Sequence, residues 1–449
     1  MIRILVRLPA LLGLWLTLCV AGSAQELAKP LAAVELKDGD SIVFLGDSIT
    51  HQRLYTQYVE DYFYTRFPKQ RLVLHNAGVG GARAWDALAR FDKDVAAYKP
   101  KYVTILLGMN DGSYTPYKQE IFDTYRQDMT TLLDRIKEIG ATPIPMTPTM
   151  FDARAARMRD AKRDTEATTL YNSVLTYFGT WLREVSAEKG YGFVDMWGPL
   201  NTITLNERER DPKFTLIADA VHPDAPGQVV MATALVNDIG LPHQVSRIVI
   251  TQEKSTGNGG TLSDFKLATE GNQAQLEFTW QADSLPWVLP EEAALGAQLT
   301  HLGHRLSREA LEVHGLPTGT YALSIDGQEV GQYGTAALER GVELETNAKT
   351  PQYAQALEVA MLNKQRNDGP IGALRGEWSK FQQYARLKQA AEAQPDNADL
   401  KMQLAKSEEA INGMDDRVAK ANADARAIED QIFTKNQPPA RKYVLQRIK

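Results

Sequence analysis

The sequence predicts an α/β fold in which helices cover both faces of a parallel sheet, followed by a β-rich module and a charged helical region. Between residues 40 and 240, apolar runs of strand length alternate with stretches of helical spacing. These runs are continuous rather than alternating, as expected for strands buried on both faces. After residue 240 the apolar pattern changes to period two, and from about residue 336 it becomes helical and highly charged. We therefore expect domains at 25–240, 241–335 and 336–449.

The strands and helices of the first domain can be placed from their apolar patterns. Strands are expected at 41–45, 71–74, 102–107, 142–146 and 192–195, and helices at 52–67, 116–140, 165–189 and 227–239. Glycine follows each of the first three strands closely. Because open α/β folds hold their ligands at the carboxyl ends of the strands, the polar residues after these strands are candidates for a site.

The segment 241–335 predicts a small β module. Residues 246–251 and 275–280 alternate apolar and polar side chains, and Asp326-Gly327 suits the tight turn of a hairpin. Two interpretations remain open. The module is either a packed structural unit or a carbohydrate-binding attachment with Trp280 and Trp287 as stacking platforms.

The segment 336–449 predicts long charged helices. Apolar residues recur in it at heptad spacing: Ile411, Met414, Val418, Ala421, Ala425, Ile428 and Ile432. This seam predicts either a helical hairpin packed on itself or on the first domain, or an arm for self-association. Pro438-Pro439 end the last helix, and we interpret the short basic tail as a solvated chain end.

The N-terminus has the pattern of a secretory signal peptide. Arg3 and Arg7 precede an apolar run at 8–20, and small residues follow at 21–24. We expect cleavage near Ala24, so that 1–24 is removed and the protein is secreted or periplasmic. The run is shorter than the roughly 20 residues of a membrane span, although an uncleaved anchor is the alternative. We expect no membrane span after its removal.

The composition excludes several classes of protein. With 43 % hydrophobic and 24 % charged residues the chain is neither disordered nor fibrous, and its net charge of −6 argues against nucleic-acid binding. Its only cysteine, Cys19, lies in the predicted signal peptide, so a thiolate nucleophile and disulfides are not expected. No metal-ligand or nucleotide-loop motif is found, so we expect no metal and no cofactor.

Four polar segments carry the candidate chemistry. They are Gly46-Asp-Ser-Ile-Thr50, Asn76-Ala-Gly-Val-Gly-Gly81, Gly108-Met-Asn-Asp111 and Asp219-Ala-Val-His-Pro223. Each follows a predicted strand or precedes a predicted helix. Taken alone, each also has a plain structural interpretation as a helix cap or a tight turn.

The fourth segment contains the one histidine with a carboxylate at useful spacing. Asp219 can accept the Nδ1 proton of His222 and leave its Nε2 free as a base. A serine hydroxyl such as that of Ser48 is a poor nucleophile at neutral pH and needs such a base. His51 lies near Ser48 in the sequence but has no carboxylate partner at useful spacing.

The ordered set of segments resembles the SGNH hydrolase superfamily, also called the GDSL esterases and lipases, over about residues 40–240. The resemblance implies a flavodoxin-like, three-layer α/β/α fold. It also implies that Ser48 is the nucleophile, that His222 is the general base and then the general acid, and that Asp219 orients His222.

The resemblance further implies an oxyanion hole, built from the N–H of Ser48, the N–H of Gly81 and the side-chain amide of Asn110. Gly78 is the alternative to Gly81, since three glycines crowd this loop. Fixed donors of this kind stabilise the negative oxygen of a tetrahedral intermediate.

The reaction implied is ester hydrolysis through an acyl-serine. Together with export, it favours a carbohydrate O-acetyl esterase that acts on an acylated small molecule or polysaccharide. The alternatives are a GDSL-type lipase or short-chain carboxylesterase, an O-acetyltransferase with the same triad, and a non-catalytic glycan-binding scaffold. Asp47 and Trp85 are candidate substrate-binding residues, Trp85 either by stacking on a sugar ring or, in a structural role, by capping the core.

Overall fold

The computed structural model describes residues 31–268 and 274–449. Its first domain is built on a parallel sheet with the strand order β2-β1-β3-β4. The strands are β1 (Ser41–Gly46), β2 (Val73–Gly78), β3 (Tyr102–Leu106) and β4 (Thr142–Pro145). The strand expected at 192–195 is reduced to one parallel bridge between Met146 and Val194.

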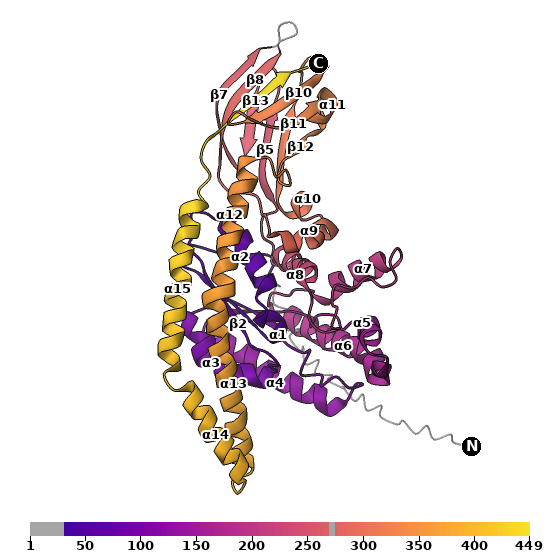
Figure 1. Cartoon of the computed structure of the whole chain (residues 1–449), viewed down its shortest axis with the longest axis vertical. Helices are drawn as coiled ribbons and strands as arrows, with labels where there is room; N and C mark the ends of the chain where they lie inside the picture. Colours follow the sequence, from indigo (N-terminus) through magenta and orange to yellow (C-terminus); the bar gives the residue numbers. More distant parts are fainter. Residues whose placement is uncertain (1–30, 269–273) are drawn as a thin grey trace, which may run out of the picture.

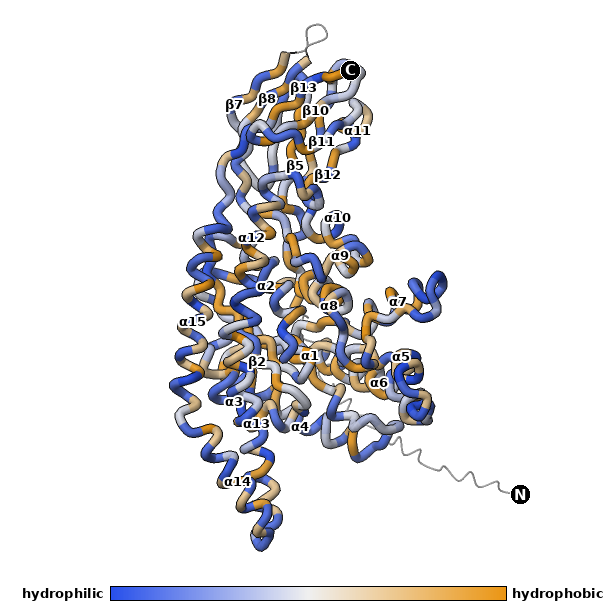
Figure 2. Tube along the Cα trace, viewed as in Figure 1, coloured by the Kyte–Doolittle hydropathy of each residue, from blue (hydrophilic) through white to orange (hydrophobic). Residues whose placement is uncertain are grey.

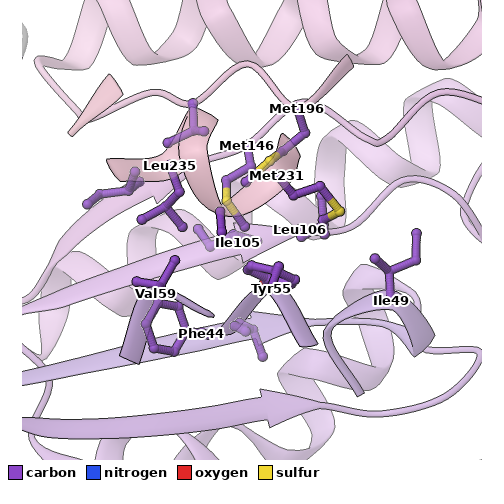
Figure 3. Packing of buried hydrophobic residues seen from close by; sticks show 14 of the residues in the cluster. Phe44, Ile49, Tyr55, Val59, Ile105, Leu106, Met146, Met196, Met231 and Leu235 are labelled. Carbon is purple, nitrogen blue, oxygen red and sulfur yellow. The ribbon is translucent and has the colours of Figure 1, made fainter. Parts of the chain in front are cut away.

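The sheet is buried on both faces, as its continuous apolar runs predict. Every residue of β1 is buried. On one face, Phe44 and Ile105 pack against residues of α2 (Leu54–Arg66) and α8 (Ala225–Asp238), as Figure 3 shows. The predicted α/β/α fold is confirmed.

The remaining helices of this domain connect the strands or follow them. They are α1 (Ser48–His51), α3 (Ala84–Asp94), α4 (Gln119–Glu138), α5 (Ala153–Arg159), α6 (Glu166–Lys189) and α7 (Trp197–Arg208), with short 3₁₀ turns at Ala96–Tyr98 and Ala161–Arg163. The helices expected at 116–140 and 165–189 are thus α4 and α6.

The predicted signal peptide at 1–24, and Cys19 with it, lie outside the described residues. Across 31–268 and 274–449, no helix combines the length and the apolar character that crossing a membrane requires.

Two sheets enclose the second hydrophobic core (Figure 1). One has the order β12-β9-β5-β6 and the other β11-β10-β13-β8-β7. Their strands are β5 (Gln244–Ile250), β6 (Ser255–Asn258), β7 (Gly260–Ala268), β8 (Gln275–Ala282), β9 (Arg308–Val313), β10 (Thr320–Ile325), β11 (Gln328–Gly334), β12 (Val342–Glu343) and β13 (Arg441–Arg447). Four short helical elements accompany them: a 3₁₀ turn (Glu291–Ala293), α9 (Ala294–Thr300), α10 (Leu302–Leu306) and α11 (Thr335–Arg340).

The basic tail corrects one sequence prediction. It is not a solvated end but β13, which pairs with both β8 and β10. Tyr443 and Leu445 of this strand are buried in the second core. The β module predicted at 241–335 is therefore incomplete. One of its inner strands, β13, comes from the end of the chain, after the helical region.

The two tryptophans proposed as carbohydrate platforms are buried. Trp280 is 2 % exposed and lies in the second core. Trp287 is also 2 % exposed, donates a hydrogen bond from Nε1 to the Tyr58 carbonyl at 2.8 Å and packs edge-on against Tyr62. Both indoles therefore stabilise the fold, and neither is free to stack on a sugar.

The C-terminal helices pack on the first domain. They are α12 (Pro351–Arg366), a π-helical turn (Asn367–Ile371), α13 (Gly372–Ala393), α14 (Ala398–Ile411) and α15 (Met414–Lys435). Heptad residues such as Ala421, Ala425 and Ile432 are buried in the first domain's core, and Figure 2 shows hydrophobic residues recurring between hydrophilic ones along α15. The seam predicted for possible self-association is thus occupied by the chain itself.

A buried carboxyl pair in the β region gives a testable pH dependence. Burial raises the pKa of Glu309 to about 8, and neighbouring Glu345 adds to the rise. The folded protein then holds a proton that the unfolded chain releases near pH 4.5. Between these values the free energy of unfolding therefore falls as pH rises.

Glu309→Gln is expected to reduce the fall of the unfolding free energy with rising pH, because the amide stays neutral. Tm measured by circular dichroism at pH 5 and pH 9 tests it. The variant should match the wild type at pH 5 and exceed it at pH 9. An equal loss of Tm in both proteins between these pH values would contradict the assignment.

Candidate active site

The first candidate side chain, Ser48, lies where β1 turns into α1. Asp47 caps α1, since its Oδ1 accepts a hydrogen bond from the Ile49 N–H at 2.9 Å. A Cβ on Gly46 would overlap the Thr50 side chain, so only glycine permits this sharp turn. The half-buried Ser48 is thereby held at the carboxyl end of the sheet.

A loop before α8 brings Asp219 and His222 to the same place. The Asp219 Oδ1 accepts hydrogen bonds from the N–H groups of Val221 at 2.9 Å and His222 at 2.7 Å. Its Oδ2 lies 2.7 Å from His222 Nδ1. His222 Nε2 lies 2.8 Å from the Oγ of Ser48, which is 174 positions earlier in the chain. The structure thus joins carboxylate, imidazole and hydroxyl in one hydrogen-bonded chain.

The electrostatics keep Asp219 charged and leave His51 neutral. Partial burial acts to raise the pKa of Asp219, but hydrogen bonds from the His222 N–H, its ring and the Val221 N–H outweigh it and hold the pKa below its usual value. Burial, with the charges of Arg375 and Arg53, lowers the pKa of His51 to about 4. His51 is therefore a weak base and does not compete with His222 for the proton of Ser48.

The backbone N–H groups that were candidates for the oxyanion hole differ in whether they already donate a hydrogen bond. The Gly78 N–H donates to Asn76 Oδ1 at 2.9 Å, which removes Gly78 as the alternative oxyanion donor. Gly81 lies on the exposed loop with φ of 67°, a left-handed conformation that favours glycine. Within the described part of the chain, the N–H groups of Ser48 and Gly81 donate no hydrogen bond to another residue.

Asn110, in the turn after β3, is held near the same site. Its Nδ2 donates to the Ala82 carbonyl at 3.1 Å and lies 3.5 Å from Asp47 Oδ2. Tyr114 donates from its hydroxyl to Asn110 Oδ1 at 3.3 Å. Since one amide hydrogen is engaged well by Ala82 and the other only by the longer contact to Asp47, the amide keeps a donor for a ligand.

The two predicted substrate-binding residues have different surroundings. Asp47 is 1 % exposed, and burial raises its pKa to about 7; it caps α1 and faces Asn110, so the structure argues against direct contact with a substrate. Trp85, at the start of α3, is half-buried and lines a groove of about 890 Å³. Gly81, Asn110 and Tyr114 line the same groove.

Two further residues contribute to the site: Asp111, from one of the four predicted segments but without a predicted role, and Arg386, which the sequence analysis did not name. Asp111 accepts hydrogen bonds from the N–H groups of Gly108 and Ala84, both at 2.9 Å, and so joins the turn after β3 to the start of α3. Arg386 of α13 lines the groove from a helix remote in sequence. Within the described residues, no three His, Cys, Asp or Glu side chains gather in a way that could hold a metal ion.

The chain is also similar to known proteins. The model of the GDSL-like Lipase/Acylhydrolase family matches residues 44–230. The solved structure of BT4096, a gut microbial diltiazem-metabolizing enzyme, superposes with a TM-score of 0.76 at 26 % identity, over 93 % of this chain and 99 % of its own.

Two curated relatives are similar over shorter stretches. An acetylxylan esterase of Geobacillus stearothermophilus is 25 % identical over 235 residues, which are 48 % of this chain and all of the relative. The uncharacterized lipoprotein YqeF of Bacillus subtilis (strain 168) is 36 % identical over 74 residues, 16 % of this chain and 30 % of the relative.

Sequence motif, fold and relatives coincide on the same part of the chain. The family match begins within β1, shortly before Ser48, and ends within α8, just after His222. The first domain therefore matches the GDSL-like lipase/acylhydrolase family and is of the SGNH hydrolase type, and the protein is a carboxylic ester hydrolase.

Proposed function

We propose that the protein is a carbohydrate O-acetyl esterase that works through a covalent acyl-serine. The observation that carries the proposal is the continuous chain from Asp219 through His222 to the Ser48 hydroxyl, with contacts of 2.7 and 2.8 Å. This is the arrangement in which a base beside a serine makes its hydroxyl nucleophilic.

The acylation step follows from these contacts. The Ser48 Oγ attacks the ester carbonyl while its proton passes to His222 Nε2, and Asp219 holds the ring and stabilises the imidazolium. The carbonyl oxygen becomes an oxyanion, for which the N–H groups of Ser48 and Gly81 and the amide of Asn110 are the donors. The intermediate then collapses, and the departing alcohol takes the proton from His222.

Deacylation repeats the sequence with water. His222 Nε2 takes a proton from the water molecule that attacks the acyl-Ser48 carbonyl. The second tetrahedral intermediate releases the carboxylic acid, and the proton returns from His222 to the Ser48 oxygen. The net reaction consumes one ester and one water and yields an alcohol and a carboxylic acid.

The groove beside the site favours a polar alcohol over a long acyl chain. Besides Trp85 and Tyr114, whose rings could pack on a sugar, its lining includes six acidic or basic residues: Arg83, Asp86, Asp111, Glu120, Asp128 and Arg386. Charged walls solvate hydroxyl groups well and an alkyl chain poorly. The similarity to an acetylxylan esterase supports an acetylated sugar as substrate.

We also propose that the protein acts outside the cytoplasm. The proposal rests on the charged, apolar and small residues of 1–24. The similarity of one segment of this chain to a protein named as a lipoprotein also supports this location. N-terminal sequencing of the mature protein after expression in its host tests the expected cleavage near Ala24, and an intact Met1 in the exported protein would contradict it.

Acetate release from acetylated oligosaccharides tests the substrate. The purified protein should release acetate from acetyl-xylooligosaccharides and hydrolyse an aryl acetate faster than the matching aryl octanoate. Preference for octanoate would favour a lipase, and acetyl transfer to an added sugar in place of acetate release would favour a transferase. Hydrolysis of none of these esters would favour a non-catalytic scaffold.

Asn110→Ala is expected to lower kcat by about 10²–10³-fold, because it removes one donor to the oxyanion. KM on an aryl acetate should change little, since the donor acts on charge that forms in the transition state. Steady-state kinetics of the variant check this. Asn201→Ala, a buried asparagine of α7, serves as the control. A fully active Asn110→Ala enzyme would show that the amide is outside the oxyanion hole.

A further inference from the structure

The helix α13 lies against the glycine loop that carries the predicted oxyanion donor. Three of its side chains donate hydrogen bonds to backbone carbonyls of this loop: Arg375 to Gly78 at 3.4 Å, Gln382 to Gly80 at 2.9 Å, and Arg386 to Gly81 at 2.7 Å. The donors come from about 300 residues later in the chain. The loop is thus held from outside the segment that matches the family.

The contact of Gln382 has a direct consequence for the oxyanion donor. The carbonyl of Gly80 and the N–H of Gly81 belong to one peptide unit, which is planar and trans. In such a unit the two groups point to opposite sides. A donor fixed on the Gly80 carbonyl therefore directs the Gly81 N–H away from α13. It also polarises the amide, which strengthens that N–H as a donor.

Two ion pairs hold α13 in this position. The guanidinium of Arg386 contacts both carboxylate oxygens of Asp86 at 2.7 and 2.8 Å, and Asp86 also accepts the Arg83 N–H at the start of α3. Deeper in the protein, Arg375 pairs with the fully buried Asp94 at 2.7 Å. Arg386 therefore joins α13, the loop and α3 in one arrangement.

The buried Asp94 extends this support to the strand that precedes Ser48. Asp94 also pairs with Arg90, which donates to the carbonyls of Ala77 at 2.8 Å and Gly46 at 3.2 Å. Burial acts to raise the pKa of Asp94, but the two guanidiniums and the His75 hydrogen bond lower it strongly, so it stays charged. The carboxylate of Asp94 thus links α13 to the ends of β1 and β2 through Arg375 and Arg90.

We propose that α13 is a positioning element of the active site and that Gln382 is the positioning residue that directs the Gly81 N–H toward the oxyanion. The inference rests on the proposed acyl-serine function and adds to it a requirement for the C-terminal helical region. Gln382 is 5 % exposed and is not among the residues that line the groove beside the site. Its effect is exerted through the Gly80–Gly81 peptide.

The test compares Gln382→Met with Gln383→Met in the full-length protein. Methionine keeps the size of the side chain but cannot donate, and Gln383 is the exposed neighbour on the same helix. Active sites are titrated with a serine-directed phosphonate, so that kcat refers to folded enzyme. We expect Gln382→Met to lower kcat on an aryl acetate about tenfold with KM within about twofold, and Gln383→Met to match the wild type.

Binding of phenylboronic acid gives a readout that a general loss of stability would not change. Its tetrahedral serine adduct carries an oxygen at the oxyanion position, so its inhibition constant should rise about as much as kcat falls. An unchanged kcat and inhibition constant in titrated Gln382→Met would overturn the inference, and so would a change confined to KM.

A second set of variants keeps the test decisive if Gln382→Met does not fold. Arg386→Met should also lower kcat and raise the inhibition constant of phenylboronic acid, with a change of KM added because Arg386 lines the groove. Arg386→Lys should recover part of kcat, and Lys388→Met on the exposed side of α13 is the control. Wild-type kinetics in Arg386→Met would overturn the inference. These outcomes are separate from failure of the proposed function, which would appear as wild-type protein without esterase activity or as an active Ser48→Ala variant.

Discussion

Ser48→Ala is expected to lower kcat for ester hydrolysis by about 10⁶-fold, the largest effect that the structure predicts. The hydroxyl lies 2.8 Å from His222 Nε2 and is the group that the proposed mechanism acylates, with His222 as its base. Without it, the donors of the oxyanion hole can assist only the slow direct attack of water on the ester.

The variant should fold and bind substrate like the wild type. Ser48 is half-buried, and its side chain contributes one hydrogen bond, to His222. Rates on an aryl acetate, with Tm measured on the same preparation, check the prediction. Ser324→Ala on β10 is the control and should keep full activity. A Ser48→Ala protein with more than a hundredth of the wild-type rate would remove Ser48 from the role of nucleophile.

Asp219→Asn is expected to lower kcat by about 10⁴-fold with little loss of structure. The amide oxygen can still accept the N–H groups of Val221 and His222, which hold the loop at 2.9 and 2.7 Å. The amide nitrogen, however, would face His222 Nδ1 with a donor. The imidazole would then carry its proton on Nε2, where it cannot accept one from Ser48.

Asp224→Asn provides a matched control for this substitution. Asp224 lies five residues later and caps α8 through a hydrogen bond from the Gly227 N–H at 3.0 Å. Asparagine caps helices about as well as aspartate, so this variant should stay active. Steady-state kinetics of both proteins decide the matter. A loss below tenfold in Asp219→Asn would show that the carboxylate is not needed to orient His222.

The sequence predicts the first domain well because its information is local. Continuous apolar runs such as the one at β3 have few structural solutions, and a parallel sheet places the residues after its strands at one edge. Ser48 could therefore be expected at this edge, while its meeting with His222 was expected from the resemblance to the SGNH hydrolases. The strand at 192–195 was overestimated, since only Val194 of this segment makes a bridge.

The later part of the chain shows where local patterns fail. Nothing in the basic tail indicates that β13 inserts between β8 and β10, because that pairing depends on the helices that bring the tail back. An indole such as that of Trp280 looks the same in the sequence whether it is buried or exposed. Likewise Gln382 lies in an ordinary charged helix, and only its docking on Gly80 gives it a role.

Covalent labelling by a serine-directed fluorophosphonate tests the central claim most directly, because the reagent needs both an activated hydroxyl and its base. Intact and peptide mass spectrometry should find one adduct per chain, on Ser48, and labelling should be slowed strongly in His222→Ala and absent in Ser48→Ala. An adduct on another residue, or equal labelling of the wild type and His222→Ala, would contradict the pairing of Ser48 with His222 on which this account depends.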